Sequence, residues 1–323
     1  MKNIILVWGV FLVIVSCTNS KTNTLGEESF FLPPPTTYNY TQVNGVKLFY
    51  REAGDPNKPT IVLLHGYPSS SHSYRNLIPM LATHYHVIAP DNLGSGYSDH
   101  PSPETTQYTF DLLAKYTDAL LKNLNINTYI MYMQDFGAPV GYRMMMKDPK
   151  RIKALIVQNA NTYLDGLTPK RQDFFKKAQQ DTSQQQQDFL YSITSKDVII
   201  NKQYLFDIDS TNYKIQSPDA WQHDLSFLQT ETDRKIQVQL FQDYYTNLLL
   251  YPTWQKMLKE TQPKTLITWG AKDLKFNKNG AKAYLRDLPN AELHLLDAGH
   301  FAAEEKTRDI AELILKFLKK NKI

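Results

Sequence analysis

Short apolar runs alternate with amphipathic stretches along most of the chain, and this rhythm predicts an α/β fold. Continuous apolar runs predict buried strands at 60–64, 85–89, 129–133, 154–158, 264–269 and 292–296. Apolar positions at helical spacing predict helices at 73–83, 110–123, 138–147 and 309–318. Strict alternation at 46–52 predicts a strand with one solvated face. Strands that alternate with helices form a mostly parallel central sheet with helices on both faces.

This rhythm breaks between residues 162 and 252. The segment contains no clear buried strand, is rich in Tyr and Phe, and includes four consecutive glutamines at 184–187 in a helix-compatible stretch. We expect a helical cap here, inserted into a core made of residues 40–161 and 253–323. Its aromatic side chains either form the core of the cap itself or cover a site.

The first 39 residues have a different composition. An apolar run at 4–15 is too short to span a bilayer comfortably and has the length of a signal-peptide core. The sequence that follows it, Ile-Val-Ser-Cys, resembles the lipobox of bacterial lipoproteins. We therefore expect a signal peptide at 1–16, a lipid on Cys17, and a tether at 17–39. This predicts a bacterial cell-envelope protein; an uncleaved membrane anchor is the alternative and would place the chain similarly.

Composition narrows the remaining possibilities. A hydrophobic content of 42% with 21% charged residues is typical of a globular chain that buries a large core. The net charge of +4 is small and the lysines are dispersed, so a nucleic-acid partner is not expected. Cys17 is the single cysteine, so it has no disulfide partner within the chain.

The most informative stretch is 129–141, where a buried strand turns into a helix within two residues. Gly137 and Ala138 suit a tight turn, and Pro139 is tolerated in a first helical turn. A side chain at such a turn projects above the sheet beside free backbone N–H groups. Here that side chain is Asp135, whose carboxylate can attack carbon without first losing a proton. Alternatively, Asp135 only caps the helix.

Three chemically capable groups follow successive sheet strands, in the order Asp135, Asp273, His300. This is the nucleophile–acid–histidine order of the α/β-hydrolase fold. From about residue 40 to 323 the chain resembles that superfamily, and more closely its epoxide hydrolase and haloalkane dehalogenase branch. The motifs that carry the resemblance are His65-Gly-Tyr-Pro68, Asp91-Asn-Leu-Gly-Ser-Gly-Tyr-Ser-Asp99, Gln134-Asp-Phe-Gly137, Trp269-Gly-Ala-Lys-Asp273 and Gly299-His-Phe301.

The resemblance implies a role for each residue. Asp135 would form an alkyl ester with the substrate, and His300, oriented by Asp273, would activate the water that hydrolyses it. The backbone N–H groups of Tyr67 and Phe136 would hold the oxyanion. Asp273 is favoured as the acid because the other usual position, after the strand at 154–158, offers Asn159-Ala-Asn161 and no carboxylate.

One position departs from the family pattern. The residue two before the nucleophile is often small, whereas here it is Met133. A bulky residue crowds the turn, so we expect a slight displacement of the turn without loss of any reacting group.

The leaving atom separates the two activities. A halide needs weak N–H donors, which related dehalogenases take from a Trp after the nucleophile and from a second Trp or Asn. Phe136 and Tyr67 occupy the corresponding positions here, and only Trp221 and Trp254 remain as possible donors.

An epoxide instead needs an acid for the alkoxide. Cap tyrosines provide this in epoxide hydrolases, and the segment around Tyr244 resembles the one that carries such a tyrosine; Tyr204 is a second candidate. The resemblance therefore favours epoxide hydrolysis to a diol, with haloalkane dehalogenation as the alternative. The expected substrate is a small hydrophobic molecule, and no cofactor or metal is expected. A non-catalytic binding lipoprotein with this fold is a further alternative.

Overall fold

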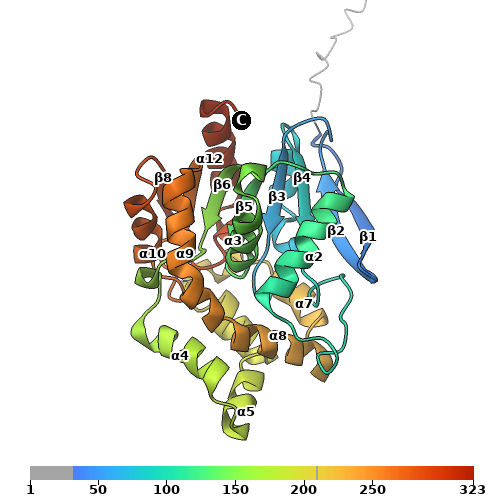
Figure 1. Ribbon diagram of the computed structural model, residues 1–323, viewed down its shortest axis with the longest axis vertical. Coiled ribbons are helices and arrows are strands. Elements are labelled where there is room, and N and C mark those ends of the chain that lie inside the picture. The colour runs from blue at the N-terminus through green and yellow to red at the C-terminus, as the bar shows by residue number, and fades with distance from the viewer. Residues whose placement is uncertain (1–31, 209) are drawn as a thin grey trace, which may run out of the picture. The chain divides into compact units, whose positions relative to one another are not determined.

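A sheet of eight strands crosses the part of the chain that the structure describes (Figure 1). This computed structural model describes residues 32–208 and 210–323, and Pro33–Ile323 forms one compact unit. The strand order is β1-β2-β4-β3-β5-β6-β7-β8. Their bounds are β1 Thr37–Val43, β2 Val46–Ala53, β3 Thr60–Leu64, β4 His86–Pro90, β5 Tyr129–Gln134, β6 Ile152–Gln158, β7 Thr265–Gly270 and β8 Glu292–Leu296.

The sheet is parallel from β4 to β8, and β1 and β2 pair antiparallel at one edge. All residues of β5 are buried, which accounts for the unbroken apolar run that predicted it. The carboxyl ends of β3, β5, β7 and β8 lead to Tyr67, Asp135, Asp273 and His300 respectively. Because these strands are parallel, their carboxyl ends point in the same direction, and the four residues lie together beyond those ends.

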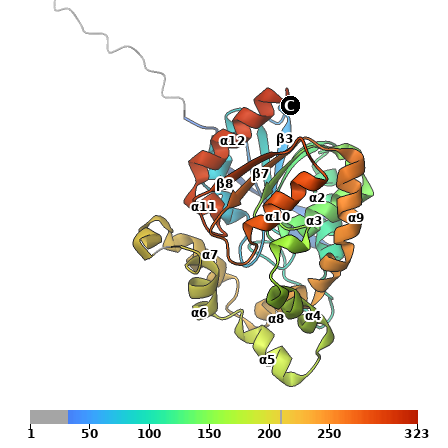
Figure 2. The same ribbon diagram turned by 90° about the vertical axis from the view of Figure 1, so that its left-hand side faces the viewer.

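Helices cover both faces of the sheet, as the alternation predicted (Figure 2). The faces have separate apolar cores: α1, α11 and α12 contribute to one, and α2, α3, α9 and α10 to the other. The helices are α1 Leu77–Ala82, α2 Phe110–Asn123, α3 Gly137–Lys147, α9 Tyr245–Thr261, α10 Lys278–Ala283, α11 Ala302–Glu305 and α12 Thr307–Lys320, with short 3₁₀ turns η1 Ser71–Tyr74, η2 Pro149–Arg151 and η6 Tyr284–Arg286.

The inserted segment is helical and gathers at one end of the molecule, below the sheet in Figure 1. It starts after β6, and its last helix, α9, returns the chain to β7. Its elements are η3 Leu164–Gly166, α4 Pro169–Gln180, α5 Gln184–Ser192, α6 Lys196–Val198, the π-helical turn η4 Ile199–Tyr204, η5 Ser210–Ile215, α7 Pro218–Ser226 and α8 Glu231–Asp243.

Three boundaries differ from the expected ones. Strand β1 begins at Thr37, so the end of the expected tether at 39 is too late. The helix expected at 73–83 is divided into η1 and the shorter α1. The expected end of the cap at residue 252 falls inside α9, which passes through Pro252 without interruption.

The predicted signal peptide and Cys17 lie outside the described residues, so the lipid anchor stays a prediction. Within residues 32–208 and 210–323, no helix is both long enough and apolar enough to cross a bilayer.

Candidate active site

The turn between β5 and α3 holds Asp135 in a left-handed conformation, with φ of 49°. Asp tolerates this conformation better than most residues, but it still costs free energy. The side chain does not cap α3, whose N-cap is Phe136 and has no side-chain cap. Gly66 makes the turn possible, because a Cβ there would lie 2.3 Å from the Cβ of Asp135. The close approach brings the backbone after β3 against the carboxylate.

One predicted oxyanion donor contacts Asp135 directly. The N–H of Tyr67 donates to Asp135 Oδ1 over 2.7 Å. The preceding loop is held by His65, whose Nε2 accepts from the N–H of Asn92 over 3.0 Å. The N–H of Phe136 also lies next to the nucleophile in the chain, but no hydrogen bond joins it to Asp135 among the described residues. The structure therefore brings Tyr67 to the carboxylate and leaves the role of Phe136 a prediction.

His300 lies between the two acids. Its Nδ1 is 2.7 Å from Asp273 Oδ2, and its Nε2 is 3.4 Å from Asp135 Oδ2. All three side chains are buried, with Asp135 6% exposed. The sequence order Asp135, Asp273, His300 thus becomes a spatial order with the imidazole in the middle. In this arrangement the imidazole can take a proton from water while Asp273 stabilises the imidazolium that forms.

Asp273 is fixed by donors that include one side chain whose role the sequence analysis missed. Asn159, after β6, donates from Nδ2 to Asp273 Oδ2 over 2.7 Å. The N–H groups of Lys275 and Phe276 donate to Oδ1 over 2.7 and 2.9 Å. The absence of a carboxylate at Asn159 had excluded it as the acid, but the same position supports the acid with a hydrogen bond.

The charges of this group shift the pKa of the histidine upward. Burial alone lowers the pKa of the His300 imidazole, but the Asp273 and Asp135 carboxylates outweigh burial and raise it to about 9. Burial also works against ionisation of Asp273, yet the facing His300 holds the pKa of that carboxyl below its usual value. At neutral pH this raised pKa favours the imidazolium form of His300, which faces two carboxylates.

Met133 is accommodated by a glycine on the neighbouring helix. A Cβ at Gly141 would lie 2.5 Å from the sulfur of Met133 and 2.9 Å from that of Met131. The crowding expected at the turn is thus absorbed in α3, where Gly141 leaves room for both thioethers.

Tyr244 lies at the junction of α8 and α9, and its ring packs beside Phe136, the residue after the nucleophile. Its ring stacks on Phe175 at 3.9 Å and is tilted against Phe136 at 5.4 Å. Burial, the neighbouring Tyr251 and the Asp135 carboxylate raise the pKa of Tyr244 well above its usual value. Burial, with a smaller contribution from Asp135, raises the pKa of the neighbouring Tyr251, which interacts with Tyr244. Tyr251 is therefore a second buried phenol beside Tyr244, which the sequence did not single out.

The structure does not bring Tyr204 into this group. Its ring stacks on Phe301 at 4.2 Å, and its hydroxyl donates to the buried carboxylate of Asp224. That hydroxyl is therefore occupied within the cap.

The tryptophans of the described residues have other partners. Trp254 donates from Nε1 to the sulfur of Met146 over 3.0 Å, and Trp269 donates to the carbonyl of Phe276 over 2.8 Å. Trp221 packs edge-on against Tyr204 at 5.8 Å. Trp254 was a candidate halide donor, and its N–H is already used in packing. No group of three or more His, Cys, Asp or Glu suited to a metal occurs in residues 32–208 and 210–323.

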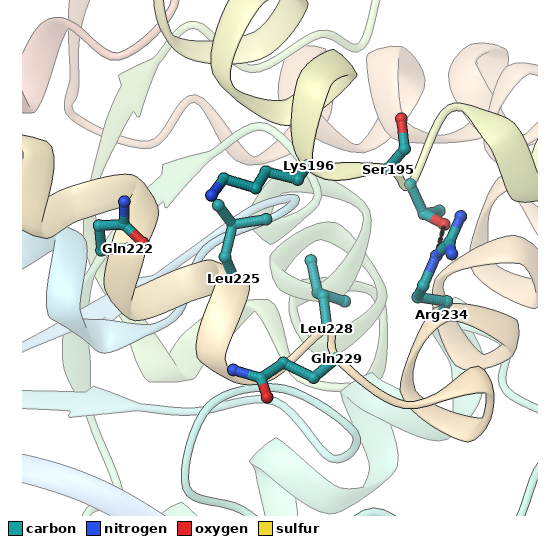
Figure 3. A pocket seen from close by; sticks show the side chains of 8 residues that line it. Ser195, Lys196, Gln222, Leu225, Leu228, Gln229 and Arg234 are labelled. Carbon is teal, nitrogen blue, oxygen red and sulfur yellow. Dashed lines mark hydrogen bonds between the residues drawn. The ribbon is translucent and has the colours of Figure 1, made fainter.

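Several cavities open in the cap, and two of them bear on the site. The one in Figure 3 has a volume of about 380 Å³ and is lined mainly by residues of α7 and of the segments before α6 and α8. The second has a volume of about 500 Å³ and lies between α4, α5, η4 and the loop after β7. Neither cavity is lined by Asp135 or His300. The second is lined by Phe241, whose ring is 4.7 Å from Tyr67 and 5.6 Å from Phe136, so it lies nearest the reacting groups.

Comparison with known proteins agrees with this geometry. The family model of the alpha/beta hydrolase fold matches residues 59–307, which is most of the chain. The chain belongs to the alpha/beta hydrolase family. The predicted fold class and superfamily are thereby confirmed.

Relatives of this alpha/beta hydrolase include enzymes of the expected branch. An uncharacterised hydrolase of Saccharomyces cerevisiae is 38% identical over 282 residues, covering 86% of this chain and 95% of the relative. A haloalkane dehalogenase of Psychrobacter cryohalolentis is 27% identical over 281 residues, covering 85% and 88%. A crystal structure of an epoxide hydrolase from Vigna radiata matches with a TM-score of 0.68 at 21% identity, covering 88% of this chain and 98% of that one. This last likeness establishes the fold alone.

Proposed function

We propose that this alpha/beta hydrolase opens epoxides through an ester on Asp135 and hydrolyses that ester to release a diol. The observation that carries the proposal is the carboxylate at the turn after β5, with Oδ1 2.7 Å from the N–H of Tyr67 and Oδ2 3.4 Å from His300 Nε2. A serine in this place would direct the chemistry to carboxylic esters. A carboxylate directs it to saturated carbon.

In the first step Asp135 attacks an epoxide carbon. The new carbon–oxygen bond to Asp135 forms as the ring carbon–oxygen bond breaks, and the alkoxide takes a proton. Tyr244 is the proposed donor, with Tyr251 beside it, because its ring packs 5.4 Å from that of Phe136, the residue after the nucleophile.

In the second step water attacks the carbonyl carbon of the ester on Asp135. Esterification removes the negative charge of Asp135, which is one of the causes that raise the pKa of His300 in the resting site. The pKa of the imidazole therefore falls after alkylation, and His300 releases its proton, which returns through solvent to the Tyr244 phenolate left by the first step. The neutral imidazole then accepts a proton from water and gives it to the alkoxide oxygen that leaves when the ester bond breaks. Asp273 stabilises the imidazolium that results, and the Tyr67 N–H stabilises the oxyanion at Asp135.

Haloalkane dehalogenation is the competing function, and the 27% identity to a haloalkane dehalogenase favours it. Against it, the indole N–H of Trp254 already has a partner, Trp221 packs against Tyr204 in the cap, and Phe136 follows the nucleophile. For a departing alkoxide, Tyr244 packs beside Phe136 and is the proposed donor.

A panel of epoxides and haloalkanes, tested against the full-length protein and its Tyr244→Phe variant, separates these functions. Epoxide turnover should fall by roughly a hundredfold or more in Tyr244→Phe, because the ring remains but the acid is lost. The double variant with Tyr251→Phe should lose more. Tyr213→Phe is the matched control, since Tyr213 is 43% exposed and takes no part in the proposed mechanism.

Three outcomes would contradict the proposal. Epoxide hydrolysis at the parent rate in the double variant would remove the acid from the mechanism. Turnover of haloalkanes alone would establish the competing function, and turnover of neither class would favour the non-catalytic alternative.

A further inference from the structure

The cavity of about 500 Å³ combines aromatic walls with positive charge. No Asp or Glu is among the residues that line it. Its mouth exposes apolar side chains, since Leu274 is 61% and Phe206 47% exposed. The residues that line it are Thr168, Lys170, Arg171, Phe174, Phe189, Ile193, Val198, Lys202, Gln203, Phe206, Phe241, Leu274 and Lys275.

Of the four cations, only one is neutralised. Lys275 forms a buried ion pair with Asp207 at 3.0 Å. Within the described part of the chain, the side chains of Lys170, Arg171 and Lys202 have no hydrogen bond or ion pair. Arg171 lies against aromatic faces instead, 5.7 Å from the ring centroid of Phe174. A guanidinium that is partly buried without an anion has lost hydration and gained no partner, so a bound anion would stabilise it.

The local helix reinforces this positive potential. Lys170 and Arg171 lie in the first turn of α4, and that turn contains no acidic residue. The amino end of a helix carries partial positive charge, so cations there are unfavourable and acidic residues are the usual choice. Helix α4 has the opposite arrangement, directly at the wall of the cavity.

The cavity of Figure 3 shows how an arginine of this cap is satisfied when no ligand is needed. Arg234 donates to Thr194 Oγ1 over 2.8 Å and to the carbonyl of Tyr191 over 2.7 Å. It also lies 3.6 Å from the ring of Tyr191. Arg171 has no such bonds, and within the described residues Lys196, which lines the cavity of Figure 3, also has none.

The cationic cavity lies beside the reacting groups, with the ring of Phe241 in its wall. Phe241 lines it and also contacts the rings of Tyr67 and Phe136, which flank Asp135. Burial lowers the pKa of the Arg171 guanidinium, and the carboxylates of Asp273 and Asp135 act on it in the opposite sense. Phe241 thus lies between this cavity and the rings that flank Asp135, so an extended molecule that passes Phe241 could occupy both.

We propose that this cavity binds the carboxylate-bearing chain of an amphipathic substrate, and that Arg171 and Lys202 select for its negative charge. The inference rests on the proposed function, because it places the epoxide at Asp135 and the carboxylate at the cavity mouth. The apolar walls would hold the intervening hydrocarbon.

Hydrolysis of epoxidised oleate and of its methyl ester, measured at low and high salt, tests the proposal. The parent should favour the acid in kcat/KM by roughly tenfold or more at low salt, as for a hydrogen bond to a charged group. High salt should reduce this preference. Arg171→Gln should abolish it mainly through KM, since the contact is remote from the reacting carbon, and Arg171→Lys should retain part of it.

Lys176→Gln is the matched control, because Lys176 lies on the same helix, is exposed, and does not line the cavity. It should leave the acid-to-ester ratio unchanged. Equal turnover of acid and ester by the parent would overturn the proposal, as would an equal loss with both substrates in Arg171→Gln.

Binding of a non-reactive ligand keeps this inference separate from the proposed function. Laurate should bind the full-length protein in calorimetry more tightly than methyl laurate, and Arg171→Gln should remove the difference even if no epoxide is turned over. Binding of anionic vesicles that is lost in Arg171→Gln, without any preference for laurate, would assign these cations to a membrane surface and overturn the proposal.

Discussion

Asp135 occupies a backbone conformation that few residues adopt, and the contacts around it explain why the chain retains it. The left-handed turn directs Oδ1 to the Tyr67 N–H and Oδ2 to His300. Gly66 permits the approach of the β3 loop because any side chain there would strike the Asp135 side chain. The strained turn therefore costs free energy, and the surrounding contacts maintain it in a conformation that positions the nucleophile.

The stability of the folded protein should report on His300. Its pKa is raised from 6.5 to about 9 on folding, so proton binding stabilises the folded state. This contribution is complete below about pH 6.5 and is lost as the pH rises through 9, at an upper limit of about 3 kcal/mol. Denaturant titrations should therefore show a decline in unfolding free energy from pH 6.5 to 9 in the parent, and a shallower one in His300→Gln. Parallel pH profiles for the two proteins would contradict a raised pKa at His300.

At the scale of elements, the packing of α3 on β5 decides how the turn is supported. Gly141 in α3 faces the sulfurs of Met133 and Met131 in β5, and the helix lies close to the strand as a result. The bulky residue before the nucleophile and the small residue on the helix are therefore complementary.

Gly141→Ala tests this complementarity. In an ordinary helix the change stabilises by up to about 1 kcal/mol, but overpacking typically costs about 1–3 kcal/mol. We expect net destabilisation in urea titrations, because the new methyl would lie 2.5 Å from the Met133 sulfur. In a Met133→Ala background the same change should cost less, because only the Met131 sulfur, at 2.9 Å, would still oppose the new methyl. An equal effect in both backgrounds would show that Met133 does not occupy the space at Gly141.

The elements that the sequence predicted best are those whose burial leaves a clear pattern. Strand β3 and helix α2 have the expected bounds, because a fully buried strand and an amphipathic helix have distinct spacing. The sequence pattern did not predict strand β1. One reason is that β1 is an edge strand, where Tyr38 and Tyr40 are 62% and 48% exposed. Its pairing with β2, rather than its own apolar pattern, makes it a strand.

The candidate site was predictable from the sequence only in the part that lies at the strand ends. Strand ends in a parallel sheet meet at one edge, so Asp135, Asp273 and His300 could be grouped from the sequence alone. The direction of cap side chains could not, because many aromatic residues share the insertion and their spacing does not show which face the core. Tyr204 and Tyr251 were thus indistinguishable, and Arg171 gave no signal as one cation among many.

At the scale of the whole molecule, the cap lies over the reacting groups and gives the site a restricted, charged approach. The aromatic residues of the insertion serve both readings left open by the sequence: some pack within the cap, and Phe241 and Tyr244 cover the nucleophile. A cap over the nucleophile would keep bulk water away from the reacting atoms in the proposed first step.

The localisation of the protein is a separate proposal, which depends on Cys17 and the predicted signal peptide before it. A lipid on Cys17 would tether the hydrolase to a membrane through the segment before β1. Growth with labelled lipid should label the parent and leave Cys17→Ala unlabelled, with Ser16→Ala as a control. Equal label in Cys17→Ala and the parent would contradict the lipoprotein assignment.

The central claim is that Asp135 forms a covalent ester which His300 removes. Mass spectrometry of intact His300→Gln protein after exposure to an epoxide tests it most directly. The account predicts an added mass equal to the whole epoxide, located on the peptide that contains Asp135 and missing from Asp135→Ala, because an opened epoxide retains all its atoms. An adduct lighter by a hydrogen halide, formed from an alkyl halide alone, would instead indicate dehalogenation. No adduct in His300→Gln, together with full turnover in Asp135→Ala, would contradict the account.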